Sequence, residues 1–405
     1  MKAKLQARTE RNVIKSLFGA LLVATVLLIS VGWNAAKADW QLASSPNPGT
    51  NNTLYDVATL SASNAWAVGT YGTPQAGNRT LVEHWSGTGW SVVPSPNPGA
   101  GNVLSAVAAS SANDVWAVGY YWLANGNYQT LVEHWNGSSW SVIPSANRDI
   151  TPNNLLADVA AVSPNDVWAV GINYGDLPPG TRTPPPLIEH WDGAAWTIIS
   201  SPTEAAGGEL FGIAARSAND VWAVGRYHPR NIWQTLVEHW NGTSWSIVSS
   251  PSPGSYDFNV LTGVTALSAN NAWAVGGYQT RVGATLSFIV HWDGTHWRKV
   301  AELNPSTTYG SENVLAGIAA TSANDVWALG YYRNDSTNQQ YQTLSQHWNG
   351  TNWSIVASPN AGRADQINGV AGLLGAGFWA VGAYSISGND YYGNLVAPRT
   401  LVLSH

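Results

Sequence analysis

Histidines recur at one position of a repeated segment, and four of them directly follow a glutamate. These pairs are Glu83-His84, Glu133-His134, Glu189-His190 and Glu238-His239. An acid beside an imidazole suits proton transfer, but consecutive strand residues point to opposite faces, so one pair cannot act as a dyad. The same position continues without the acid as Val290-His291, Gln346-His347 and Ser404-His405. We therefore predict structural histidines that hydrogen-bond the Asp or Ser of a nearby SAND segment.

A second group of candidate residues is aromatic and cationic and lies where the repeats vary most. Trp122 and Trp233 belong to no repeated tryptophan series, so the repeat pattern does not account for them. A Tyr follows the Gly of each VWAVG-like segment by two or three residues. Such a Tyr could pack between repeats or could contact a ligand, and the sequence leaves both interpretations open. Flat apolar rings among polar side chains suit sugar rings or extended peptides. The candidate ligand-binding residues are Tyr121, Trp122, Arg226, Tyr227, His228, Arg230, Trp233 and Tyr332.

A repeat of 50 to 54 residues must position these side chains. Its two signatures are SANDVWAVG (111–119) and TLVEHWNGSSWS (130–141). The Trp of the first signature recurs seven times, at Trp66, Trp116, Trp168, Trp222, Trp273, Trp327 and Trp379. Two further series bring the regularly spaced tryptophans to 20 of 23. A period near 50 residues built of short apolar runs and tight turns predicts an all-β fold, a seven-bladed β-propeller.

Each repeat reads as four short strands that form one blade. In the second repeat we expect them at 104–109, 115–121, 130–135 and 140–144, with the small residues of the first strand nearest the axis. The SAND and Asn-Gly segments predict short turns on one face, because Asn-Gly tolerates the positive φ that tight hairpin turns require. The two variable connections then emerge together on the opposite face, which we expect to bind the ligand.

The last repeat lacks a fourth strand. Its three predicted strands lie near 367–373, 378–384 and 400–405, where the chain stops. The segment WQLASS (40–45) matches the missing strand, as in WSVVPS. We expect this amino-terminal strand to complete the last blade, which would close the ring and remove open sheet edges.

Motifs of catalysis and metal binding are absent from the sequence. There is no GxSxG, no HExxH and no P-loop. The histidine strand would lie away from the propeller axis, so these side chains cannot converge on one metal. We therefore predict no catalytic residue, no metal and no cofactor. Paired carboxylates for polysaccharide cleavage could still come together from different loops, which sequence spacing does not reveal.

Composition and charge narrow the partners further. The chain has 405 residues, no Cys and a charged fraction of 10%. Beyond residue 38 it carries 12 Lys plus Arg against 23 Asp plus Glu, and Lys299 is the single lysine. A surface this acidic does not suit phosphate backbones, so we expect no nucleic-acid partner.

Residues 1–38 differ from the propeller region, 39–405. A basic start, an apolar run over 17–31 and Ala36-Lys37-Ala38 before Asp39 predict a secretory signal peptide. The alternative is a retained membrane anchor, since the apolar run is nearly long enough to span. We expect a secreted monomer without membrane contact after cleavage.

Parts of the repeat resemble known families. The order VWAVGGY, variable loop, HWDGTHW resembles the kelch repeat, with the Gly-Gly pair at Gly276-Gly277. Trp191-Asp192 and Trp292-Asp293 resemble the WD dipeptide of WD40 blades, and HWNGTSW partly resembles the Asp-box of sialidases. Residues 39–405 as a whole are similar to secreted bacterial seven-bladed propellers with tandem SANDVWAVG and EHWNGTSW repeats. This resemblance implies the fold, and propellers serve many functions.

The sequence thus predicts a secreted, non-enzymatic binding module. The expected ligand is a carbohydrate or cell-surface polymer, or else an exported protein, held on the variable-loop face. A polysaccharide-acting glycoside hydrolase or lyase on the same scaffold is the alternative.

Overall fold

The structure is a computed structural model. It describes residues 40–73, 77–147, 153–174, 185–202, 207–229, 232–254, 258–335, 340–387, 395 and 397–405. The predicted signal peptide and Arg230 lie outside the described residues. Within the described part of the chain, no helix is long and apolar enough to cross a membrane.

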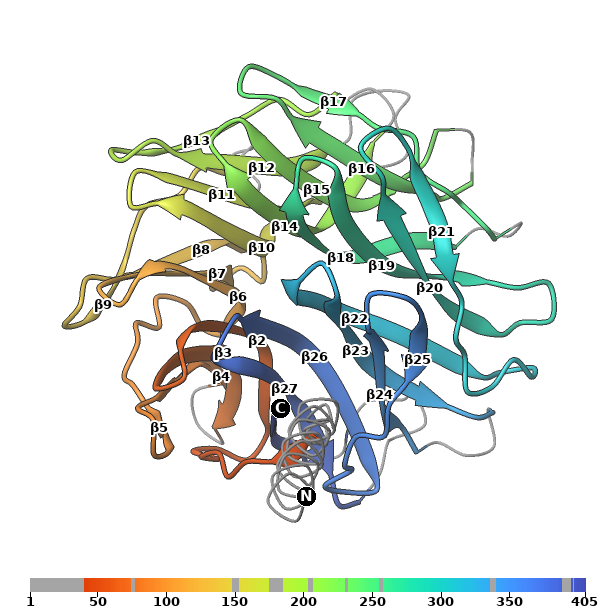
Figure 1. Cartoon of the computed structure of the whole chain (residues 1–405). Coiled ribbons are helices and arrows are strands. Elements are labelled where there is room, and N and C mark those ends of the chain that lie inside the picture. Colours follow the sequence, from red (N-terminus) through yellow and green to blue (C-terminus); the bar gives the residue numbers. More distant parts are fainter. Residues whose placement is uncertain are drawn as a thin grey trace, which may run out of the picture. The chain divides into compact units, whose positions relative to one another are not determined.

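The described elements are β-strands, numbered here by repeat (Figure 1). Repeat 1 has β2 (Asn52–Ser61), β3 (Asn64–Thr73), β4 (Gly77–Trp85) and β5 (Trp90–Val92). Repeat 2 has β6 (Asn102–Ser111), β7 (Asp114–Trp122), β8 (Tyr128–Trp135) and β9 (Trp140–Val142). Repeat 3 has β10 (Asn154–Ser163), β11 (Asp166–Asn173), β12 (Pro186–Trp191) and β13 (Trp196–Ile198). Repeat 4 has β14 (Gly208–Ser217), β15 (Asp220–Tyr227), β16 (Gln234–Trp240) and β17 (Trp245–Ile247).

The remaining repeats follow the same plan. Repeat 5 has β18 (Asn259–Ser268), β19 (Asn271–Gln279), β20 (Thr285–Trp292) and β21 (Trp297–Ala301). Repeat 6 has β22 (Glu312–Ser322), β23 (Asp325–Arg333), β24 (Gln342–Trp348) and β25 (Trp353–Ile355). Repeat 7 has β26 (Ala364–Leu373), β27 (Gly377–Ser385) and β28 (Arg399–Ser404), and β1 (Gln41–Leu42) precedes repeat 1.

Each repeat folds into a four-stranded antiparallel sheet in which the strands pair in chain order. The sheets of repeats 5 and 6 are additionally joined by one parallel bridge between Thr285 and Glu312. In the last sheet the fourth position is taken by β1, whose Gln41 and Leu42 pair with Ser404 and Leu403 of β28. Figure 1 shows β2, β6, β10, β14, β18, β22 and β26 nearest the common centre around which the sheets are arranged, so each is the inner edge strand of its repeat.

The first strand of every repeat contains a β-bulge. In repeat 2, Leu104 pairs with Gly119 and Ala106 with Val118, which leaves Ser105 unpaired between them. The bulge brings the backbone of β6 so close to β7 that a Cβ on Gly119 would lie 2.1 Å from the Val103 carbonyl oxygen. The Gly that ends each VWAVG segment is therefore required by this close approach of two strands.

The Asn-Gly segments form tight turns. Gly137 has φ of 92°, whereas Asn136 is not among the residues with positive φ. Instead, Asn136 Oδ1 accepts hydrogen bonds from the backbone N–H groups of Ser138 (3.0 Å) and Ser139 (3.1 Å). The predicted tight turn is present, and an Asx turn of this kind satisfies the loop with positive φ at the glycine but not at the asparagine.

The cores lie between neighbouring sheets and are built on the tryptophan series. Trp66 of repeat 1 packs on Trp135 and Trp140 of repeat 2, with ring centroids 5.0 and 5.4 Å apart. In the same way, Trp379 of the last repeat packs on Trp85 and Trp90 of the first, at 4.9 and 5.1 Å. The regularly spaced indoles thus form cores between neighbouring repeats.

Six of the seven repeated histidines hydrogen-bond the last residue of the SAND segment or its counterpart, and the ring of the seventh, His405, packs on Trp327 at 4.5 Å. His134 Nε2 lies 2.7 Å from Asp114 Oδ1, and the His134 ring packs on Trp116 at 4.2 Å between centroids. Asn64 and Asn271 take the place of the aspartate for His84 and His291, at 3.0 Å each. The structural interpretation of this histidine series is confirmed.

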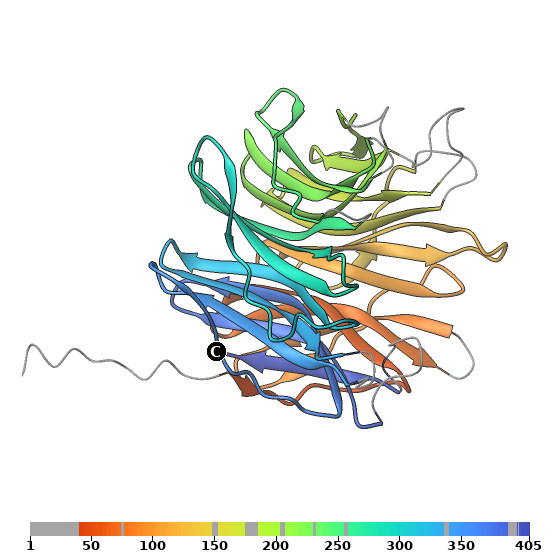
Figure 2. The ribbon, with the colours of Figure 1, turned by 90° about the vertical axis from the view of Figure 1, so that its right-hand side faces the viewer.

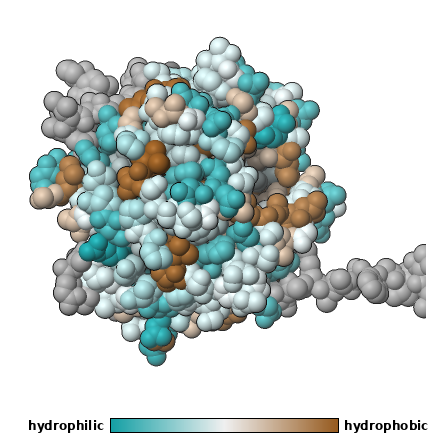
Figure 3. All heavy atoms as spheres, turned by 90° about the vertical axis from the view of Figure 1, so that its left-hand side faces the viewer, coloured by the Kyte–Doolittle hydropathy of each residue, from teal (hydrophilic) through white to brown (hydrophobic). Residues whose placement is uncertain are grey.

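Because the strands alternate in direction, the connections gather on two opposite faces (Figure 2). One face carries the short turns, and the other carries the connections between second and third strands and between consecutive repeats. We call the second one the variable-loop face. On the side of the molecule drawn in Figure 3, apolar side chains form small separate patches in a mostly hydrophilic surface.

Candidate binding face

Three of the five residues predicted in repeat 4, Arg226, His228 and Trp233, come together. Arg226 Nε donates a hydrogen bond to Glu209 Oε2 at 2.6 Å, across the β14–β15 pair. The Arg226 guanidinium lies 4.2 Å from the Trp233 ring centroid, and the His228 ring lies 5.0 Å from the same indole. Arg230 is outside the described residues. Sequence reasoning missed Glu209, which is buried and balances the charge of Arg226.

Trp122 ends β7 on the same face. Its ring packs edge-on against Tyr120 at 5.0 Å, and a Cβ on Gly101 would lie 2.7 Å from an atom of the Trp122 ring. The Trp122 backbone also bonds to the connection between repeats 1 and 2, with its carbonyl oxygen accepting from Ala100 N at 2.9 Å. The position of this indole is therefore fixed by the loop that precedes repeat 2.

Further tyrosines connect these two sites. Tyr128 lies 5.8 Å from Tyr120 and 6.5 Å from Tyr174, measured between ring centroids. Tyr174 is 45% exposed. Partial burial raises the pKa of its hydroxyl group, and the charges of Glu209 and Arg226 are near enough to act on it as well. Burial, with Tyr55 and Tyr128 nearby, raises the pKa of Tyr120 to about 12, so it is a neutral hydroxyl at physiological pH. We call Tyr120, Trp122, Tyr128, Tyr174, Arg226 and Trp233 the aromatic arc.

Tyr121, Tyr227 and Tyr332, also predicted as ligand contacts, mainly support the loops. Their hydroxyl groups donate to Gln129 (2.7 Å), Gln234 (3.2 Å) and Gln342 (2.5 Å) on the neighbouring strand. A Cβ on Gly99 would lie 2.7 Å from the Tyr121 ring, so this tyrosine packs directly on the SPNPG loop. Tyr332 lies in repeat 6, away from the residues of the arc in repeats 2 to 4. Their contact with a ligand stays a prediction.

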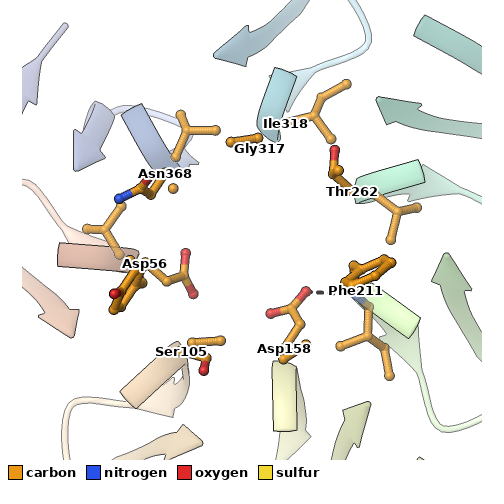
Figure 4. A pocket seen from close by; sticks show the side chains of 18 residues that line it. Asp56, Ser105, Asp158, Phe211, Thr262, Gly317, Ile318 and Asn368 are labelled. Atoms are coloured by element: carbon orange, nitrogen blue, oxygen red, sulfur yellow. Dashed lines mark hydrogen bonds between the residues drawn. The ribbon is translucent and has the colours of Figure 1, made fainter. Parts of the chain in front are cut away.

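A cavity of about 240 Å³ lies where the first strands of the repeats meet (Figure 4). The carboxyl groups of Asp56 and Asp158 point into it. Asp56 Oδ2 accepts from Val107 N at 2.9 Å, and Asp158 Oδ2 accepts from Ile213 N at 2.7 Å, so each aspartate bonds to the first strand of the next repeat.

Two polar side chains make equivalent links elsewhere in the cavity wall. Thr262 Oγ1 donates to the Leu315 carbonyl oxygen at 2.6 Å, and Asn368 Nδ2 donates to the Leu54 carbonyl oxygen at 2.9 Å. In repeats 1, 3, 5 and 7, one side chain of the first strand thus forms a hydrogen bond with the backbone of the first strand of the next repeat. The last of these links joins repeat 7 to repeat 1.

Burial perturbs both aspartates of the cavity. It raises the pKa of Asp56 to about 7 against the opposing effect of its backbone hydrogen bonds. The pKa of Asp158 lies well above its ordinary value because of burial and then the nearby negative charge of Asp56. The sequence did carry a signal for this pair, since Asp replaces the Ala or Gly found at the same bulge position of the other repeats. Among the described residues, no group of three or more His, Cys, Asp or Glu could hold a metal ion.

Comparison with known proteins supports the fold. No protein-family model matches the sequence, and no curated protein matches it either. The structure is similar to that of YCF48 bound to a D1 peptide, with a TM-score of 0.53, 13% identity, and coverage of 91% of this chain and 95% of that chain. It is also similar to a PL25 polysaccharide lyase, an ulvan lyase, with a TM-score of 0.51, 9% identity, and coverage of 91% and 94%. The chain has a β-propeller fold.

A third similar structure is the GH74 xyloglucanase of Xanthomonas campestris. It has a TM-score of 0.48 and 12% identity, and the match covers 81% of this chain and 56% of that chain. At these identities the similarities concern the fold alone.

Proposed function

We propose that the chain forms seven blades whose ring is closed by its two ends. The seven-fold sequence repeat supports the blade count. Three contacts support closure: the pairing of β1 with β28, the packing of Trp379 on Trp85, and the Asn368 hydrogen bond to Leu54. A closed ring would have no unpaired blade edge at the junction of the termini.

On this scaffold, the proposed function is non-catalytic binding of a carbohydrate polymer by the aromatic arc. The observation that carries the proposal is that aromatic rings of repeats 2, 3 and 4 form a series on one face. Rings of sugars have apolar faces that stack on aromatic side chains, and their hydroxyl groups need polar partners nearby. A series of rings over three repeats suits an extended chain of sugars better than a single small molecule.

The charges in the arc favour an uncharged ligand. The single cation of the arc, Arg226, is hydrogen-bonded to buried Glu209 and is covered by Trp233. Its charge is therefore balanced, and attraction of an anionic polymer would require breaking a partly buried ion pair. We accordingly propose a neutral polysaccharide. We also propose that residues 1–38 direct export, after which the protein works as a secreted monomer.

Two other functions of the same scaffold are distinguished from this proposal by experiment. The YCF48 structure holds a peptide, so an exported protein is the second ligand class. Polysaccharide cleavage is favoured by one observation, the raised pKa of Asp56 and Asp158, since a protonated carboxyl group is what a general acid requires. Both carboxylates already accept backbone N–H groups, however, and for this reason we place binding first.

A glycan array probed with the full chain tests the proposal, with product analysis of each bound polysaccharide. Saturable binding of neutral glycans without new reducing ends or unsaturated products is the expected result. Chain cleavage would favour the enzyme, and loss of that cleavage in Asp56→Asn would assign it to the central cavity. Binding of no glycan, together with specific capture of one exported protein, would replace the carbohydrate by a protein ligand.

A further inference from the structure

The two glycines of the Gly276-Gly277 pair differ in whether the structure requires a glycine at their position. A Cβ on Gly276 would lie 2.0 Å from the Val260 carbonyl oxygen, so this position requires glycine. A Cβ on Gly277 would meet nothing closer than 3.4 Å, and φ at Gly277 is not positive. Neither backbone conformation nor close packing therefore demands glycine at 277.

The absence of a side chain at Gly277 leaves space between repeats 5 and 6. Gly277 pairs with Val260, and the other repeats carry a side chain at the same register position. Those residues are Thr70, Tyr120, Ile172, Arg226, Tyr331 and Ala383. Beside Gly277 there is a cavity of about 440 Å³ between repeats 5 and 6. Its volume lies within the range of about 300–1,000 Å³ usual for small-molecule sites.

The walls of this cavity combine apolar and hydrogen-bonding groups. Phe258, Val260, Val314 and Leu315 provide apolar surface. Thr262, Gln279, Thr285, Glu312 and Asn313 provide the polar surface. Thr262 also lines the central cavity, so the two hollows adjoin at this residue. Since Gly277 and Gln279 lie at the end of β19, the cavity belongs to the variable-loop face.

The charged group in the wall is balanced within the protein. Glu312 Oε2 accepts a hydrogen bond from the Tyr341 hydroxyl at 2.8 Å and lies 3.2 Å from Arg333 Nε. A ligand with a net charge would meet no uncompensated opposite charge in this wall. The wall therefore suits a neutral ligand that has an apolar face and several hydroxyl groups.

Asn313 adds an unsatisfied acceptor to the wall. Its Nδ2 donates to the carbonyl oxygens of Thr285 (2.9 Å) and Ser306 (2.8 Å), whereas Oδ1 is buried without a hydrogen-bond partner among the described residues. The equivalent Asn102 and Asn259 use Oδ1 to accept the N–H of Gly99 and Gly254. A buried acceptor without a donor is unfavourable, so a ligand hydroxyl group that reaches this oxygen would supply the missing hydrogen bond while Nδ2 keeps its two.

We infer that this cavity, which we call the Gly277 cavity, binds one neutral sugar ring, as a second subsite apart from the aromatic arc. The inference rests on the proposed carbohydrate function and names a place and a ligand class for it. In this arrangement the apolar face of the ring packs between Phe258 and Val314, and its hydroxyl groups bond to Gln279 and the polar residues of β22.

The test fills the cavity with the residue found at the same position elsewhere. Gly277→Tyr copies Tyr120 and Tyr331, and Gly277→Ala is the matched control that leaves most of the space open. Neutral disaccharides of glucose, galactose, mannose and xylose are titrated separately into the full chain by calorimetry and saturation-transfer NMR. We expect at least one to bind saturably, with affinity lower by about tenfold or more in Gly277→Tyr and within about twofold in Gly277→Ala.

Two further measurements keep the result interpretable. If Gly277→Tyr does not fold, Val314→Phe narrows the cavity from the opposite wall and should weaken disaccharide binding in the same way. Polysaccharide binding is measured in parallel with Trp233→Ala. If the filled variants bind disaccharides like wild type while Trp233→Ala weakens polysaccharide binding, the Gly277 cavity is not a sugar site. The proposed function would still stand in that case. If neither disaccharides nor polysaccharides bind the wild type, both fail.

Discussion

Replacing Glu83 by Gln should remove a pH dependence of stability that has the opposite sign to ordinary acid denaturation. Glu83 is buried between the last and the first repeat, where its Oε2 accepts a hydrogen bond from Ser45 Oγ at 2.7 Å. Ser45 Oγ in turn forms a hydrogen bond with Thr400 Oγ1 at 2.9 Å. Ser45 therefore links the Glu83 carboxyl group to the carboxy-terminal strand β28. Burial outweighs the hydrogen bond and raises the pKa of Glu83 from 4.5 to about 7.

The sign follows from the proton count. Between pH 4.5 and 7 the folded protein keeps a proton on Glu83 that the unfolded chain has released, so the free energy of unfolding falls as pH rises. The stability from this group is complete below pH 4.5 and lost by the time pH has passed 7. A rise of the Glu83 pKa from 4.5 to about 7 corresponds to roughly 3 kcal/mol, at about 1.36 kcal/mol for each factor of ten in proton affinity.

The assay is urea unfolding of wild type and Glu83→Gln from pH 4.5 to 8. Gln is a suitable replacement because Gln346 holds the equivalent buried position in repeat 6, where its Nε2 donates to the Leu303 carbonyl oxygen at 2.9 Å. We expect the variant to gain about 3 kcal/mol relative to wild type across this range. Glu302→Gln is the control with the opposite sign, since hydrogen bonds from Lys299 and Tyr278 lower the pKa of Glu302 despite partial burial. A stability difference between wild type and Glu83→Gln that does not change with pH would refute the reasoning.

Further substitutions test one link between two sheets and one close approach of strands within a sheet. Asn368→Ala leaves the Leu54 carbonyl oxygen without its donor and should lower the free energy of unfolding by about 1–3 kcal/mol, measured by denaturant titration; an effect below about 0.5 kcal/mol would argue against a link there. Gly276→Ala forces a Cβ against the Val260 carbonyl oxygen and should destabilise the protein by about 3 kcal/mol, whereas Gly277→Ala should have little effect; equal melting temperatures for the two variants would contradict the distinction drawn between these glycines.

Much of the scaffold could be predicted because it is repeated. The strand positions, the histidine partners and the tryptophan cores each recur in the sequence at a fixed spacing, so one local rule predicts them all. The Asn-Gly turns show the limit of such a rule. Positive φ and an Asx hydrogen bond both suit Asn, and only the structure shows that Asn136 uses the second.

The candidate sites were harder to predict because they depend on contacts between distant segments. Arg226 was singled out from its loop, but its partner Glu209 lies on another strand, and its balanced charge changes the expected ligand. Asp56 and Asp158 are 102 positions apart in the sequence and meet only because their strands surround one cavity. Gly277 was noticed as half of a Gly-Gly pair, but the space it leaves depends on the neighbouring repeat.

The most direct test of the account is the affinity of a neutral polysaccharide, selected on the glycan array, for three variants of the full chain. Trp122→Ala and Trp233→Ala each remove one ring of the aromatic arc, and Leu374→Ala removes an exposed apolar side chain from the short-turn face. We expect each Trp variant to stay folded, with a cooperative unfolding transition, and to lose about 1–2 kcal/mol of binding free energy, and the Leu374 variant to bind like wild type. Wild-type affinity in both Trp variants would show that the aromatic arc is not the binding site.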